Sequence, residues 1–145
     1  MSAPSSTWIF NAVSNIIHHL YFDITKNKEL PLVLMTNVVN KHKIRIIAET
    51  SKIAGKNTIR FYYENLFRYI EGKEFSWDIK YPTIKYKVLK VVIHELFHIA
   101  QDETKFITID ELEKNINEQT FSFIKNNKTE IEKWYGKFTI PRKER

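Results

Sequence analysis

Cysteine is missing from the 145-residue chain, which excludes disulfide bonds, thiolate metal sites and cysteine nucleophiles. Glycine and proline are scarce, with three and four residues, so little of the chain is suited to long loops. No apolar run approaches the roughly 20 residues that a membrane-spanning helix needs. The N-terminal segment lacks the positive start and apolar stretch of a secretory signal. We therefore expect a cytoplasmic protein without a membrane partner.

The composition is that of a globular protein, with 43% hydrophobic and 28% charged residues. The net charge of +6 is unevenly distributed. Fourteen lysines and arginines face six acidic residues between positions 24 and 90, whereas acidic residues prevail from 91 to 132. A basic middle region could attract phosphates or an acidic protein surface. A solvated, lysine-rich surface accounts for the same pattern.

Apolar spacing predicts a mainly α fold of four to five helices. Trp8, Ala12, Ile16, Leu20 and Ile24 recur every fourth residue, as on one face of a helix. Turn and cap residues set the other predicted boundaries, among them a capping box at Thr108-x-x-Glu111. These helices span about 31–55, 58–71, 84–102 and 108–126, with a short restart from 129.

Around residues 73–86 the spacing of apolar residues changes from helical to alternating. Phe75, Trp77, Ile79 and Tyr81 alternate with polar residues, which predicts one short β element there. No linker or internal repeat divides the chain. We expect a single helical domain over residues 1–136 and a loose basic tail over 137–145.

The sharpest chemical pattern is His94-Glu95-x-x-His98 in the predicted helix 84–102. Residues four apart share one helical face, so both imidazoles point the same way, as zinc coordination by two histidines requires. Glu95 lies about 100° round the helix, where a carboxylate could accept a proton from a water beside the metal. A catalytic zinc also needs a third protein ligand.

Residues 91–100, VVIHELFHIA, and 115–119, NINEQ, together resemble the gluzincin (thermolysin-like) zinc metallopeptidases. Nineteen residues separate His98 from Glu118, which is the thermolysin-like spacing. The resemblance implies zinc as cofactor, His94, His98 and Glu118 as its ligands, and Glu95 as the general base. It also implies a peptide or protein substrate. Glu111 and Glu113 are competing candidates for the third ligand.

The chain departs from that family's pattern at several positions. Ser122 stands where the family has an acidic residue one turn after the glutamate ligand, and no histidine follows His98. Tyr135 is the only downstream tyrosine. The sheet edge that aligns a substrate would have to come from residues 73–86. Zinc binding is therefore better supported by the sequence than catalysis.

Two other interpretations stay open. Both histidines could simply lie on the wet polar face of a bundle helix. Alternatively, cations interleaved with aromatic residues over 60–87 could bind single-stranded nucleic acid. In size, charge and composition the chain also resembles small helical proteins of archaeal viruses, some of which bind nucleic acid or occupy the DNA channel of RNA polymerase. That resemblance implies a non-enzymatic partner of nucleic acid or of a nucleic-acid-handling machine.

Overall fold

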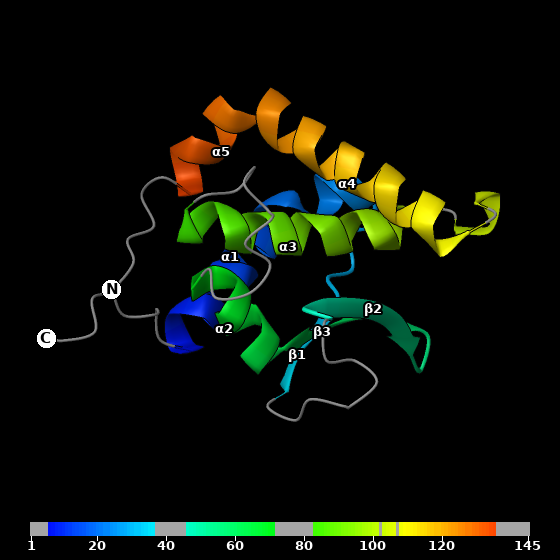
Figure 1. The fold of residues 1–145 in the computed structure, drawn as a ribbon, viewed down its shortest axis with the longest axis horizontal. Helices are drawn as coiled ribbons and strands as arrows, with labels where there is room; N and C mark the ends of the chain where they lie inside the picture. The colour runs from blue at the N-terminus through cyan, green and yellow to red at the C-terminus, as the bar shows by residue number, and fades with distance from the viewer. Residues whose placement is uncertain (1–5, 37–45, 72–82, 102, 107, 136–145) are drawn as a thin grey trace, which may run out of the picture.

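The computed structural model describes residues 6–36, 46–71, 83–101, 103–106 and 108–135 (Figure 1). Five α-helices, a three-stranded sheet and a short 3-10 turn make up these ranges, and the predicted mainly α fold is confirmed. In chain order the elements are α1 (Ser6–Thr25), β1 (Leu32–Thr36), β2 (Ala48–Ile53), β3 (Lys56–Tyr62), α2 (Tyr63–Glu71), α3 (Ile84–Ala100), η2 (Glu103–Lys105), α4 (Ile109–Asn126) and α5 (Lys128–Tyr135).

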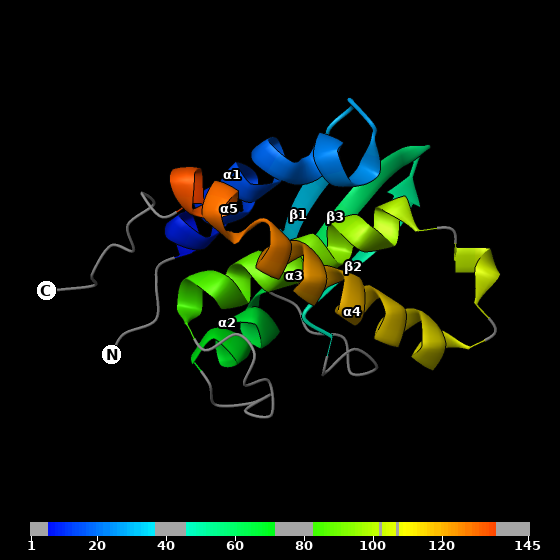
Figure 2. The same cartoon turned by 90° about the horizontal axis from the view of Figure 1, so that it is seen from above.

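Helix α3 is the centre of the fold. It contacts α1, α2, α4 and strand β2, and Figure 2 shows it between α1 and α4. Its apolar sequence explains this position, because an apolar helix gains most when several elements cover it. The buried side of α1 contains the predicted series from Trp8 to Ile24. The core therefore holds α3 from several directions and leaves one polar strip of it facing a cleft.

The sheet occupies residues that we predicted to be helical. Its strand order is β1-β3-β2, with β1 parallel and β2 antiparallel to β3. The predicted helix 31–55 is wrong: Ala54 and Gly55, at φ 53° and 78°, form the tight turn of the β2–β3 hairpin. Two successive residues with positive φ suit such a hairpin turn, whose twist matches that of its strands. The predicted start of the next helix at 58 is also wrong, because β3 continues to Tyr62.

Two sequence predictions concern segments outside the described residues. Most of the expected β element at 73–86 lies in 72–82, and its last residues begin helix α3 at Ile84. The expected basic tail lies in 136–145, so its boundary at 136/137 stays a prediction. Among the described residues, no helix is long and apolar enough to cross a membrane.

The chain reverses between α3 and α4, so that α4 packs back along α3. Gln101 caps the end of α3, and Thr108 begins α4 by accepting a hydrogen bond from the Glu111 amide at 3.1 Å. The capping box predicted at Thr108 is thus confirmed on its threonine side. A hydrogen bond of 2.8 Å from Gln119 to Gln101 joins α4 to the end of α3. This reversal brings the acidic side chains of α4 within reach of the α3 histidines.

Candidate metal centre

His94 and His98 lie one turn apart on the cleft side of α3. Their ring centroids are 4.9 Å apart, and each side chain is only 13% exposed. Leu89, Ile93 and Leu96 are buried on the other side of α3. Their burial fixes the rotation of the helix about its axis. The same apolar pattern that forms the core therefore sets the direction of both imidazoles.

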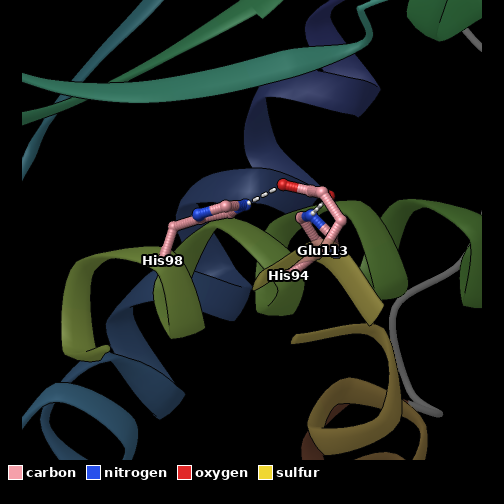
Figure 3. Close-up of side chains that lie close together, drawn as sticks. All are labelled: His94, His98 and Glu113. Carbon is pink, nitrogen blue, oxygen red and sulfur yellow. Dashed lines mark ion pairs between the residues drawn. The ribbon is translucent and has the colours of Figure 1, made fainter. Parts of the chain in front are cut away.

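The third member of the site is Glu113, in the second turn of α4. Its two carboxylate oxygens lie 3.1 Å from His94 Nε2 and 2.9 Å from His98 Nε2 (Figure 3). One ligand atom from each of these three residues lies within 4.8 Å of the others, so the group could hold a metal ion. No other such group occurs among the described residues.

Glu118, the third ligand implied by the gluzincin resemblance, is not part of this group. Its side chain is exposed, and so is that of Glu111. Helix phase explains the difference: five residues turn an α-helix by about 140°, so Glu113 and Glu118 cannot both face α3. Leu112, Ile116 and Thr120 are the buried side of α4. Glu113 borders that side, whereas Glu118 lies opposite it.

The spacing and protonation of the three residues fit a metal ion. Zinc bonded at about 2.0–2.1 Å in a tetrahedron keeps its ligand atoms roughly 3.3 Å apart, and one ligand atom from each of the three residues lies within 4.8 Å of the others here. Burial lowers the pKa of His94, and hydrogen bonds from both histidines hold the pKa of Glu113 well below its usual range. Neutral imidazole and ionised carboxylate are the forms that bind metal.

The surroundings of the histidines differ from those of a zinc peptidase in one respect. The buried His94 Nδ1 has no hydrogen-bond partner among the described residues. Metal-bound histidines usually donate from this second nitrogen to a carboxylate or carbonyl. Asn117, one turn after Glu113, lies where an acidic residue would follow this glutamate, and it lines the cleft. In the sequence Glu113 was only a competing candidate for the third ligand and Asn117 was not considered, although their helical spacing was readable.

Glu95 is buried beside the histidines and lines the same cleft, with 5% of its surface exposed. Its Oε1 has no hydrogen-bond partner among the described residues. Burial is the main cause that raises its pKa to about 8; the charges of Glu113 and Glu49 add to this shift, whereas His98 and Lys90 oppose it. A carboxyl group with such a pKa can both accept and donate a proton near neutral pH.

The site opens into a cleft of about 610 Å³ between α3, α4 and the sheet. Strand β2, at one edge of the three-stranded sheet, contributes Ala48, Glu49 and Thr50 to its wall, and a teal strand runs above the histidines in Figure 3. Ile46, Ile47, Val91, Ile109 and Leu112 provide an apolar lining. The strand beside the site is thus β2, whereas we had expected one from 73–86.

Other candidate residues lie away from this cleft or in the core. Tyr135 is 2% exposed and donates a hydrogen bond to the Lys85 carbonyl at 2.7 Å, at the other end of α3. Of the aromatic residues considered for base stacking, Phe61, Tyr62 and Tyr69 are buried. Phe75, Trp77 and Tyr81 lie outside the described residues. Tyr63 and Tyr86 are half-buried, and the nucleic-acid interpretation stays a prediction.

No protein-family model, curated protein or solved structure matches the chain.

Proposed function

We propose that the protein is a zinc-dependent metallohydrolase that cleaves peptide bonds, with His94, His98 and Glu113 as zinc ligands. The observation that carries this proposal is the convergence of two imidazole nitrogens and a carboxylate within 4.8 Å beside a buried glutamate, in an open cleft. Glu113 replaces Glu118 in the ligand set that the gluzincin resemblance implied. Three protein ligands would leave room for water or substrate on the metal, as in catalytic rather than structural zinc sites.

The ligand types favour zinc over the other common divalent ions. Calcium and magnesium prefer oxygen ligands, whereas a site of two imidazoles and one carboxylate suits zinc. The same ligand set with open positions also serves non-haem iron, so the identity of the metal needs measurement. Peptide hydrolysis, unlike iron chemistry with oxygen, calls for a general base, and the buried Glu95 in the same cleft supports this choice.

Glu95 handles the proton in the proposed reaction. Zinc in the site would supply Lewis-acid chemistry that makes a water molecule acidic at neutral pH. Glu95 would accept a proton from the attacking water as the water oxygen bonds to the peptide carbonyl carbon. It then gives the proton to the leaving nitrogen when the C–N bond breaks. Burial raises the pKa of Glu95 to about 8 in the metal-free protein, and the positive charge of a bound zinc ion would favour the ionised form that accepts the proton first.

The edge position of β2 supports an extended peptide as substrate. An edge strand presents backbone N–H and C=O groups to which a peptide can add as a further strand. Residues 48–50 of this strand line the cleft that contains the histidines and pair with β3 on the other side of the strand. The apolar lining residues provide contacts for side chains of the peptide. Together these features favour a peptide over a small polar substrate.

The test compares the wild type with Glu95→Gln after zinc loading, on a quenched-fluorescence peptide library. We expect the wild type to hydrolyse some of these peptides. Glu95→Gln should keep zinc but lose at least about 99% of the rate, in line with the 10²–10⁴-fold typical of general-base catalysis. Glu111→Gln, which changes an exposed carboxylate, is the matched control and should keep full activity. Peptide hydrolysis by Glu95→Gln at the wild-type rate would remove Glu95 from the mechanism.

A further inference from the structure

A second hollow lies at the end of α1, and it shares no described lining residue with the metal cleft. Its volume is about 290 Å³. The residues that line it are His18, Tyr21, Phe22, Asn27, Lys28 and Leu30. Phe22 and Leu30 have 48% and 45% of their surfaces exposed, and Lys28 is exposed as well. Apolar and positively charged side chains thus meet at the rim of one hollow.

The turn of the β2–β3 hairpin lies beside this hollow. The Asn57 side-chain amide donates a hydrogen bond to the Tyr21 hydroxyl at 3.3 Å, and Lys56 Nζ lies 3.9 Å from a carboxylate oxygen of Glu29. Ile53, which pairs with Lys56 across the turn, has 43% of its surface exposed. In Figure 2 the segment after α1 and the turn end of the hairpin both lie on the upper side of the view. The hairpin therefore adds a further exposed apolar side chain to the same end of the molecule.

Basic residues outnumber acidic ones around these apolar side chains. Residues 22–32 and 51–57 together carry a net charge of +2. The charged residues in these ranges are Lys26, Lys28, Lys52 and Lys56, opposed by Asp23 and Glu29, and all six are exposed. We call the exposed side chains of the two ranges the tip surface. A charged partner responds to the summed field of the tip surface, so the attraction needs no single ammonium to be unpaired.

We propose that the tip surface binds an anionic lipid bilayer. Phe22, Leu30 and Ile53 enter the headgroup region, and the lysines face the lipid phosphates. Exposed apolar side chains that are rimmed by polar residues mark a contact with a protein or a membrane. Here the positive charge of the rim favours the membrane, because apolar insertion and attraction to acidic lipids add in surface binding. A second copy of the chain fits less well, because a symmetric contact would bring the lysines of both copies together.

The proposal is independent of the zinc site. The metal cleft takes residues 46–50 from the first half of β2 and the segment before it, whereas the tip surface contains the other end of that strand. The sequence led us to expect no membrane partner, because no segment of it could span a bilayer. Binding to the surface of a bilayer does not need such a segment. Loss of peptide hydrolysis and loss of lipid binding can therefore be observed separately.

Co-sedimentation of the full chain with vesicles tests the proposal. Vesicles of phosphatidylcholine alone are compared with vesicles that also contain about 30% phosphatidylglycerol. At low salt we expect binding at least about tenfold tighter to the anionic vesicles. Most of this difference should vanish near 1 M salt, where charges are screened within about 3 Å. Equal binding to both kinds of vesicle, or no binding to either, would overturn the proposal.

Serine variants test the apolar contribution. Phe22→Ser combined with Leu30→Ser should weaken binding to anionic vesicles at least about tenfold, because both side chains lose the apolar area that enters the bilayer. Phe10→Ser is the matched control: this phenylalanine lies twelve residues earlier on α1 and is 45% exposed. The control should bind like the wild type. Unchanged binding by the double variant, or equal loss in Phe10→Ser, contradicts the proposal.

Charge variants test the lysines. Lys26→Gln combined with Lys28→Gln should weaken binding to anionic vesicles at least about tenfold, since each lysine near such a surface contributes roughly a fivefold factor. Lys125→Gln, which changes an exposed lysine in the last turn of α4, is the control and should bind like the wild type. Equal weakening by the control would assign the attraction to the overall charge and overturn the proposal.

Tryptophan variants keep the proposal testable if the serine variants fail to fold. Leu30→Trp should show a blue-shifted fluorescence on addition of anionic vesicles, because its indole enters the headgroup region. Phe10→Trp should show no such shift. The opposite pattern, or no shift in either variant, contradicts the proposal. Light scattering of the wild type addresses the other occupant: a dimer that Phe22→Ser combined with Leu30→Ser dissociates would identify a second copy and overturn the membrane contact.

Discussion

Burial of the Glu95 carboxyl group should make the metal-free protein lose stability as the pH rises. Burial raises the pKa of this group from 4.5 to about 8 in the folded protein. The folded state therefore holds a proton that the unfolded chain releases above about pH 4.5. The resulting contribution to the free energy of unfolding is fully present below that pH. It is lost as the pH rises to about 8. One pKa unit corresponds to about 1.4 kcal/mol, so the whole effect is on the order of a few kcal/mol.

Denaturant unfolding in the presence of EDTA tests this reasoning. The free energy of unfolding of wild type, Glu95→Gln and the exposed control Glu111→Gln is measured between pH 5 and 8. The wild type and the control should lose stability relative to Glu95→Gln as the pH rises, because the amide cannot ionise. Other groups, among them His94, titrate in all three proteins and largely cancel in the comparison. Parallel curves for wild type and Glu95→Gln would refute the buried, protonated carboxyl group.

Two further predictions concern the scaffold and the alternative partner. Thr108→Ala removes the side chain that accepts from the Glu111 amide and should lower the free energy of unfolding by roughly 0.5–2 kcal/mol, as measured by urea denaturation; an unchanged midpoint would contradict this. If the basic middle region binds nucleic acid, the affinity for single-stranded DNA should fall steeply between 50 and about 200 mM salt, because phosphate contacts release counterions. Absence of binding at low salt would end that interpretation.

Much of the helical framework could be predicted from the sequence because its signals are local. Each signal lies within a few turns of chain: the apolar residue at every fourth position in 8–24, the HExxH helix and the Thr108 cap. The sheet could not be predicted in the same way. Ala48–Ile53 and Lys56–Tyr62 contain both polar and apolar residues, and their strand character depends on pairing with each other and with β1. Such pairing joins residues far apart in sequence, which local spacing does not reveal.

The candidate site was predictable in its α3 half and only partly in its α4 half. Two histidines and a glutamate on one helix follow from spacing alone. The choice among Glu111, Glu113 and Glu118 instead depends on which side of α4 packs against α3. The buried side, Leu112, Ile116 and Thr120, places Glu113 at its border. The gluzincin resemblance implied Glu118 from its distance in sequence to His98. That distance does not indicate which side of α4 packs against α3.

The central claim is that His94, His98 and Glu113 bind zinc, and metal analysis of tag-free protein tests it most directly. Wild type, Glu113→Ala and Glu118→Ala are purified in parallel, incubated with zinc, desalted and analysed by inductively coupled plasma mass spectrometry. We predict about one zinc ion per chain for the wild type and for Glu118→Ala, and far less for Glu113→Ala, because loss of one of three protein ligands leaves the site weak. No zinc in the wild type, or full zinc in Glu113→Ala, would contradict the claim.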